Sequence, residues 1–172
     1  MAAIEAIATQ YLEADAASVP FSSIPATYEH LQVRGSHRAA GAVGGQAFYI
    51  ELNATAGTGY SSHVIRAHST TVGANALTGT AYIQIYDASH GSSVDAAEYA
   101  TIFMDVLDYA NTNKNTTVQF VAGTALTHGD SRVSVGSGLW DDTAAITQIK
   151  FTPSNGNMVR GSEFTLYGLN SS

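Results

Sequence analysis

Near the end of the chain, between Trp140 and Asn170, two runs of residues alternate between apolar and polar side chains with a period of two. This period is typical of half-buried β-strands, because successive side chains of a strand point to opposite faces of its sheet. Two apolar runs, Ile146–Phe151 and Phe164–Leu169, flank a loop that begins at Pro153 and continues with Ser, Asn, Gly and Asn. Proline lacks the N–H that a ladder needs, and Gly and Asn tolerate the backbone angles of turns. We therefore expect a long hairpin that closes an antiparallel domain.

Short runs of the same kind occur along the rest of the chain, with turn residues between them. The expected strands are Tyr28–Ser36, Phe48–Leu52, His63–His68, Ala81–Tyr86, Tyr99–Tyr109, Thr116–Ala122 and Arg132–Val135. A helix is an alternative for Tyr99–Tyr109, the longest apolar run, but its β-branched and aromatic residues favour a strand that forms a hairpin with Thr116–Ala122. Thr70–Thr80 is expected to be a loop, whereas Ser18–Ser22, which contains Pro20, is either an edge strand or a connection. About nine or ten short strands predict an all-β antiparallel β-sandwich or a barrel.

The first seventeen residues allow two interpretations. Ile4, Ile7 and Tyr11 would lie on one face of a short helix, and the alanine content agrees with this. The alternative is an extended arm in which Thr9–Leu12 forms a strand. We accordingly divide the chain into residues 1–17, an N-terminal arm or edge segment, and residues 18–172, a single β-sandwich domain. At 172 residues the chain is long enough to bury a substantial core.

The composition favours small and uncharged side chains. Ala, Gly, Ser and Thr make up close to half of the chain, Cys is absent, and charged residues are only 12%, about half of the roughly 25% usual for globular proteins. The absence of Cys excludes disulfides and thiolate metal sites. Small side chains limit the apolar area per residue, so burial between subunits would add stability, and we expect oligomerisation or assembly.

The charge distribution and the length of the apolar runs argue against nucleic acid and membranes as partners. The net charge is −7, and the seven Lys and Arg residues are spread singly along the chain, so binding to nucleic acid is not expected. No apolar run approaches the roughly 20 residues that span a bilayer, so no membrane partner is expected. The N-terminus lacks a basic region followed by an apolar core. We expect the protein to be made and used inside a cell, or to leave it as part of a larger particle.

The histidines form no convincing metal site in the sequence. His63 and His68 have opposite parity on a strand and therefore cannot share one face. His128 and Asp130 share parity in a loop, but no third ligand lies near them in the sequence. Asp141 and Asp142 lack the ordered ligand spacing of a calcium loop and are interpreted as the cap of a short turn. No cofactor or metal ligand is predicted.

The remaining candidates for chemistry are aromatic. Tyr60, Tyr109 and Trp140 are the side chains that we considered for stacking on a sugar, and for Trp140 packing in the core is the better interpretation. No Ser lies in a nucleophile-elbow motif and no glycine-rich loop matches a phosphate-binding pattern. We therefore predict no catalytic residue and expect a protein that is not an enzyme.

Several phrases of the sequence resemble the β-sandwich virion proteins of tailed bacteriophages, in the order that this family has. They are Phe21–Tyr28 with the following Leu31 and Arg38, then Tyr109–Thr116, Gly138–Trp140, Ala145–Ile149 and Gly161–Gly168. The resemblance runs from about Phe21 to Leu169, nearly the whole chain. It implies a jelly-roll-like sandwich, usually trimeric, without catalytic residues. Proteins of this family decorate capsids as cement proteins or form head fibres, and such domains also occur as the terminal domains of tail proteins. Their opening segment is extended, which favours an arm or edge strand for residues 1–17.

The resemblance implies a virion structural protein, synthesised in the host cytoplasm and located on the capsid surface. The compact length, without a heptad stalk or repeats, favours a capsid decoration protein that binds the outer shell as a homotrimer and stabilises contacts between major capsid proteins. Ile4, Ile7 and Tyr11 are the predicted contacts with the capsid or with another subunit. The alternative is a tail-located receptor-binding domain that holds a host glycan. A cellular carbohydrate-binding module comes third and an enzyme last.

Overall fold

The computed structural model describes residues 4–41, 45–54, 57–91, 95–126 and 131–171, which form twelve β-strands and no helix. The strands are β1 (Ile4–Tyr11), β2 (Val19–Ser22), β3 (His30–His37), β4 (Gly45–Leu52), β5 (Tyr60–His68), β6 (Thr71–Thr80), β7 (Ile83–His90), β8 (Ala100–Leu107), β9 (Thr116–Thr124), β10 (Arg132–Trp140), β11 (Gln148–Pro153) and β12 (Glu163–Leu169). All of the strand pairs are antiparallel. The predicted all-β antiparallel class is therefore confirmed.

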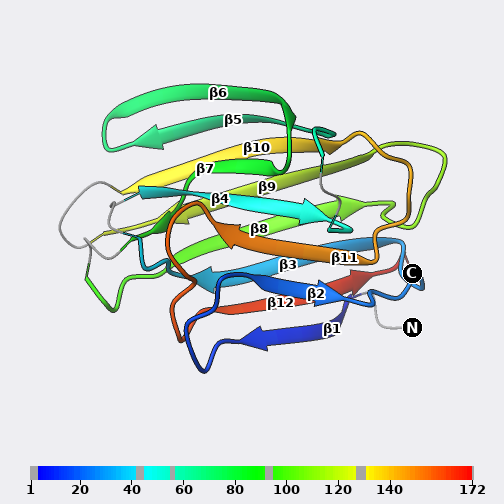
Figure 1. Cartoon of the computed structure of the whole chain (residues 1–172), viewed down its shortest axis with the longest axis horizontal. Helices are drawn as coiled ribbons and strands as arrows, with labels where there is room; N and C mark the ends of the chain where they lie inside the picture. The colour runs from blue at the N-terminus through cyan, green and yellow to red at the C-terminus, as the bar shows by residue number, and fades with distance from the viewer. Residues whose placement is uncertain (1–3, 42–44, 55–56, 92–94, 127–130, 172) are drawn as a thin grey trace.

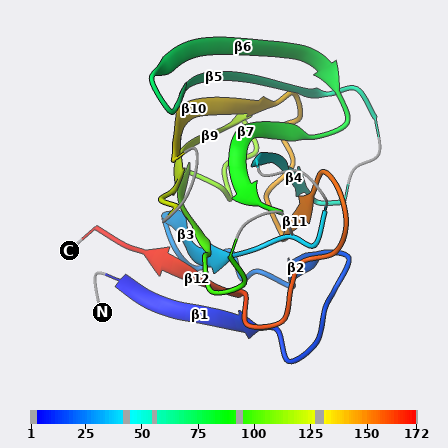
Figure 2. The same cartoon turned by 90° about the vertical axis from the view of Figure 1, so that its left-hand side faces the viewer.

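The strands form two sheets that pack face to face as a β-sandwich (Figure 1). The large sheet has eight strands in the order β1-β12-β3-β8-β9-β10-β5-β6, and the small sheet has four in the order β2-β11-β4-β7. Figure 2, which looks along the strands, shows the β5–β6 end of the large sheet arching over the edge of the small sheet. The number of strands exceeds the nine or ten that the sequence predicted.

The core lies between the sheets and is rich in aromatic rings. Phe151 of β11 stacks on Phe48 of β4 and on Phe164 of β12, with ring centroids 5.6 and 5.2 Å apart. The ring of His37, fully buried on β3, stacks on Phe48 at 4.4 Å, and its Nε2 lies 2.9 Å from the backbone oxygen of Ala88. Aromatic side chains bury large areas and prefer such offset contacts, so this cluster joins the two sheets.

The expected closing hairpin is wrong. Its two strands exist and alternate as predicted, but β11 pairs with β2 and β4 in the small sheet, and β12 pairs with β1 and β3 in the large sheet. The segment between them therefore crosses from one sheet to the other. Alternation reveals which residues face a core, and it is equally compatible with two strands that pair and with two strands that face one another across that core.

Two further expectations are corrected by strands that the sequence did not reveal. Thr71–Thr80 is not a loop but the edge strand β6, and the turn before it is confined to Ser69 and Thr70, with Ser69 at a φ of 52°. Its glycines and asparagine suggested a turn, but pairing with β5 along the whole strand outweighs these local preferences. The helical alternative for Ile4, Ile7 and Tyr11 is also wrong, because Ile4–Tyr11 is edge strand β1 of the large sheet.

Other local predictions are confirmed. β2, which carries Pro20, is an edge strand of the small sheet, as expected for a residue that cannot donate to a ladder. β8 and β9 pair as the predicted hairpin. Several strands are longer than expected: β10, for example, continues from Val135 to Trp140. In the described part of the chain, no helix is long and apolar enough to cross a membrane.

Candidate interaction face

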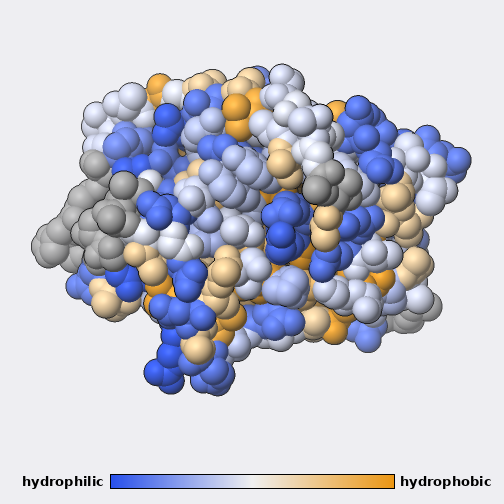
Figure 3. Space-filling model, in the orientation of Figure 1, coloured by the Kyte–Doolittle hydropathy of each residue, from blue (hydrophilic) through white to orange (hydrophobic). Residues whose placement is uncertain are grey.

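The outer face of the large sheet, which points away from the small sheet, carries the large exposed apolar side chains of the described residues. Every large hydrophobic residue that is exposed in the described part of the chain belongs, by its strand register, to this face. These residues are Ile4, Tyr11, Ile65, Val72, Phe103, Leu107, Val121, Val133 and Val135. Figure 3 shows the opposite side, over the small sheet, where hydrophilic residues dominate and hydrophobic ones are scattered. The molecule therefore has two unlike sides.

The centre of this face is a row of four apolar side chains that stand opposite one another on neighbouring strands. Phe103 pairs with Val121, Val121 with Val135, and Val135 with Ile65. Their exposed fractions are 38%, 46%, 51% and 61% in the order Phe103, Val121, Val135 and Ile65. We call these four residues the apolar row. β-Branched and aromatic side chains pack well on a pleated surface, so the row is suited to burial against another surface.

A row of polar side chains runs beside the apolar row, two residues away from it on each strand. Asp105 pairs with Gln119, Gln119 lies level with Ser137, and Ser137 pairs with His63. We call these four residues the polar row. A hollow of about 420 Å³ lies over both rows. A partner with one apolar and one hydrogen-bonding edge would match the two rows.

Arg34 closes the β3 end of the apolar row. Its guanidinium lies over the rings of Phe103 and Tyr167, 5.6 and 5.5 Å from their centroids. Its Nε donates a hydrogen bond of 3.0 Å to Gln32 Oε1, and Gln32 Nε2 donates one of 2.9 Å to Asp105 Oδ1. This chain of contacts orients the cation and links it to the carboxylate of Asp105, so the charges at this end of the rows offset one another.

The three predicted contact residues do not share one face. Ile4 and Tyr11 pair with Leu169 and Glu163 and lie on the outer face, half exposed. A register shift between Ala6 and Ala8 places a bulge at Ile7, which packs against the core instead. Ile4 and Tyr11 therefore belong to the candidate face, at its β1 edge, and their role as contacts stays a prediction.

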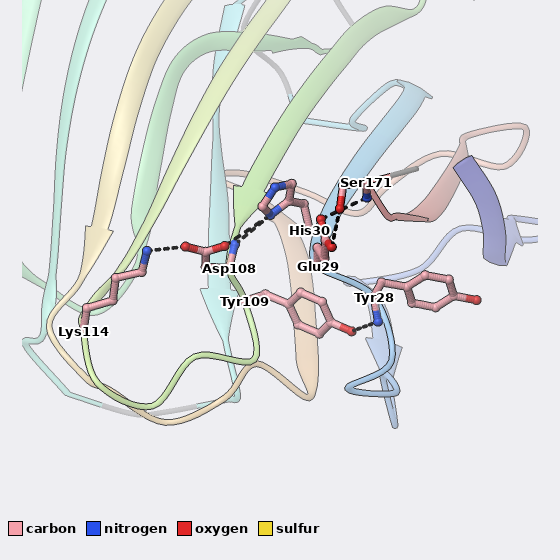
Figure 4. Close-up of polar contacts among 7 residues, drawn as sticks. All are labelled: Tyr28, Glu29, His30, Asp108, Tyr109, Lys114 and Ser171. Atoms are coloured by element: carbon pink, nitrogen blue, oxygen red, sulfur yellow. Dashed lines mark hydrogen bonds and ion pairs between the residues drawn. The ribbon is translucent and has the colours of Figure 1, made fainter. Parts of the chain in front are cut away.

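A polar cluster lies where β3 begins and β8 ends (Figure 4). Asp108 lies between Lys114, which donates to it, and the ring of His30, whose Nδ1 is 3.5 Å from Asp108 Oδ1. The hydrogen bond from Lys114, and then its charge, hold the pKa of Asp108 below its ordinary value. Glu29 accepts the hydroxyl of Ser171 at 2.6 Å and its backbone N–H at 2.9 Å, and these bonds lower the pKa of Glu29. The cluster ties the C-terminal segment to β3.

A second charged cluster connects the two sheets. Asp87 of β7 accepts hydrogen bonds from Arg66 of β5 and Arg132 of β10, and Nη2 of Arg132 lies 3.2 Å from Nε2 of His68. The side chain of Asp87 is only 8% exposed. Removing one partner of such a pair leaves an uncompensated charge in a dry site, so the cluster fixes β7 against the large sheet.

The residues that the sequence singled out for chemistry lie in scattered places. His63 is on the outer face and His68 on the inner one, as their parity predicted. Asp142 accepts the N–H of Ala144 at 2.8 Å, in keeping with the turn that was expected there. Among the described residues, no group of His, Asp and Glu is arranged to hold a metal ion. His128 and Asp130 lie outside the described residues.

The aromatic candidates are all internal. Trp140 and Tyr60 are each 2% exposed and Tyr109 is fully buried, so none of the three presents a face on which a sugar would stack. The expected core position of Trp140 is confirmed. The stacking considered for Tyr60 and Tyr109 is corrected: the Tyr109 hydroxyl accepts the N–H of Tyr28 at 3.3 Å and donates to the Pro25 carbonyl oxygen.

The apolar row was not identified from the sequence, although a signal was present. Residues of both parities are apolar in β8, where Ile102 and Met104 are buried while Phe103 is exposed, and the same holds for Val121 in β9. A strand that is apolar on both faces is usually covered on both. Two adjacent strands of this kind therefore indicate either a third layer or a partner.

Comparison of the chain with family models, with curated proteins and with solved structures finds no match.

Proposed function

We propose that this chain is a non-enzymatic structural protein of a phage virion, and specifically a capsid decoration protein that binds the outer shell as a homotrimer. The observation that carries the proposal is the one-sided distribution of exposed apolar residues over the large sheet. Apolar surface of this extent marks a site of protein association. A decoration protein needs such a division, with one side for its assembly and the other for solvent. That this assembly is a phage capsid is inferred from the resemblance of the sequence to the virion proteins of tailed bacteriophages.

The partners in this proposal are the major capsid protein and other copies of the chain. Ile4 and Tyr11, at the β1 edge of the face, are the residues proposed to reach the shell. They are half exposed, and their strand is anchored by pairing with β12. A contact of this kind stabilises the assembled shell by mass action, because the protein binds the assembled state and not the free subunits.

The experiment locates the protein on particles of the phage whose genome encodes it. An antibody against the chain should label the whole head in electron micrographs. Label at the tail alone, or no label on any particle, would overturn the decoration role. A second measurement is cosedimentation of the purified protein with capsids that lack it, which should saturate at a fixed number of copies per particle.

The proposed shell contact has its own test. Ile4→Ser combined with Tyr11→Ser keeps the backbone pairing of β1 with β12 but removes the exposed apolar groups. We expect this variant to keep the unfolding temperature of the wild type and to lose saturable binding to capsids. Thr9→Ser, on the same strand and face, is the matched control and should bind as the wild type does. Unchanged binding of the double variant would place the contact elsewhere.

A tail-located receptor-binding domain is the second candidate, and the hollow of about 420 Å³ over the two rows favours it. Phe103 next to Asp105 and Gln119 offers an aromatic ring beside hydrogen-bonding groups, which is the chemistry of sugar recognition. A glycan array separates the two candidates. Binding that Phe103→Ala and Gln119→Ala abolish would support the receptor-binding role.

A further inference from the structure

The outer face of β9, β10, β5 and β6 contains no Asp, Glu, Lys or Arg. Each of these strands contributes four side chains in direct cross-strand register. The four rows are Thr117, Leu139, Ser61 and Thr78; Gln119, Ser137, His63 and Ala76; Val121, Val135, Ile65 and Ala74; and Gly123, Val133, Ala67 and Val72. We call this surface the uncharged lattice. Its lack of charge contrasts with the net charge of −7 of the whole chain.

We infer that the uncharged lattice is the surface through which copies of this chain pack against one another. The inference rests on the proposed function for the homotrimer and deepens it by naming where the protomers meet. Two copies of an acidic protein approach with the least repulsion where neither surface carries charge. The lattice provides such a place, and Ile65, Val72, Val133 and Val135 in it are 44 to 73% exposed.

A second copy fits this surface better than a partner that is steered by charge. A charged partner would gain affinity and a unique register from ion pairs, and the lattice supplies no group for them. In a homotrimer the three lattices face the three-fold axis, where each packs its small and β-branched side chains against both neighbours. The lattice is also continuous with Phe103 on β8, whose ring is held by Arg34 at the border of the charged part of the face.

The available area agrees with a weak contact. Four strands at about 4.8 Å, and about 20 Å along each strand, give a face of roughly 380 Å² on each copy. Three such faces around one axis bury about 1,100 Å² in the whole trimer, which is small for a specific assembly. The contact is therefore expected to be reversible, with an assembly state that depends on protein concentration.

The test is the mass of the protein in solution, by light scattering and sedimentation over a range of concentrations. The wild type should have a multiple of the one-chain mass, three chains if the homotrimer is right. Val135→Lys places a charge at the centre of the lattice and should reduce the mass to one chain. Gln84→Lys, on the outer face of the small sheet, is the matched control and should leave the mass unchanged.

A milder pair of substitutions guards against loss of the fold. Ile65→Thr with Val135→Thr keeps the β-branched shape and adds no charge, and it should raise the concentration at which half of the protein is assembled at least tenfold. A wild type that stays monomeric at high concentration would overturn the inference. It would also be overturned if Val135→Lys were folded and kept the mass of the wild type.

A proximity measurement distinguishes the lattice from other contacts without disturbing it. The chain has no Cys, so one substitution gives a single labelling site. Pyrene attached at Ser137→Cys, within the lattice, should show excimer emission, and pyrene at Gln84→Cys should not. If a monomeric wild type bound capsids and Val135→Lys abolished that binding, the function would stand and this inference would fail. If the protein assembled through the lattice but bound no particle, this inference would stand and the proposed function would fail.

Discussion

The hydroxyl of Tyr60 on β5 is bonded to both backbone groups of Leu52 on β4, in the other sheet. It donates to the Leu52 carbonyl oxygen at 2.8 Å and accepts the Leu52 N–H at 3.0 Å. Tyr60 is 2% exposed and its ring stacks on that of Trp140, with centroids 6.3 Å apart. One side chain therefore connects the two sheets through a pair of hydrogen bonds inside the core.

Tyr60→Phe should lower the free energy of unfolding by about 1–3 kcal/mol, because it removes these bonds inside the core and leaves the ring in place. Urea unfolding followed by circular dichroism measures the change, and the slope with urea should stay that of the wild type. Tyr11→Phe, at a half-exposed position, is the control and should change stability by less than about 0.5 kcal/mol. Equal effects of the two substitutions would show that the Tyr60 hydroxyl is not held as described.

Gly138 and Gly73 form a matched pair that tests how closely the sheets pack. A Cβ at Gly138 on β10 would lie 2.4 Å from Cγ2 of the fully buried Ile83, whereas a Cβ at Gly73 on β6 would meet nothing within 4 Å. Gly138→Ala should therefore destabilise the protein by about 1–3 kcal/mol through overpacking. Gly73→Ala should be neutral or stabilising by up to about 1 kcal/mol, since it restricts the unfolded chain. A neutral Gly138→Ala would mean that the sheets can separate locally at little cost.

The accuracy of the sequence-based predictions follows from the range of the interactions involved. Alternation identified Phe151 and Phe164 as core residues, because facing a core is a property of each strand alone. Their assignment to separate sheets depends on partners far away in the chain, and nothing in the two runs specifies them. The edge strand Thr71–Thr80 was missed for the same reason, since its pairing with β5 decides its structure against its own turn-like composition.

The candidate face was predictable only in part. Ile4 and Tyr11 were selected by their apolar spacing, and the structure places both on that face. The apolar row required the knowledge that Phe103, Val121 and Ile65 lie on adjacent strands in register, which is again a long-range property. The apolar character of both faces of β8 was visible in the sequence and predicts that both are covered, but it does not say by what.

Glu29 should contribute to the dependence of folding stability on pH in the acidic range. The hydroxyl of Ser171, and then its backbone N–H, lower the pKa of Glu29 from its ordinary value of 4.5. A lowered pKa in the folded state means that the contribution is complete above about pH 4.5 and is lost as the pH falls through the folded pKa. The C-terminal segment should therefore loosen as the pH falls below 4.5, which amide exchange at Ser171 would report.

Ser171→Ala tests the cause of this shift, because it removes the hydroxyl and keeps the N–H. The pKa of Glu29, followed by NMR of its carboxyl carbon, should rise toward 4.5. Asp108 is the internal control, since its pKa is lowered chiefly by Lys114 and should stay low in this variant. A pKa of Glu29 that did not change would assign the shift to the backbone N–H of residue 171 and to the charge of His30.

Tyr49 and Tyr82 stack on the outer face of the small sheet, with ring centroids 3.8 Å apart. Burial, and then the hydrogen bond and the charge of the Tyr82 hydroxyl, raise the pKa of Tyr49 from 10.0 to about 12. Because the folded pKa is raised, the stability that Tyr49 contributes is complete below pH 10 and is lost between pH 10 and about 12. NMR of the ring carbons should show Tyr49 ionising near pH 12 while the protein stays folded by circular dichroism.

Tyr82→Phe removes the hydroxyl but keeps most of the burial, so the pKa of Tyr49 should fall part of the way toward 10.0. An unchanged pKa would assign the shift to burial and to Tyr86, and ionisation of Tyr49 near pH 10 in the wild type would contradict the stacked pair itself.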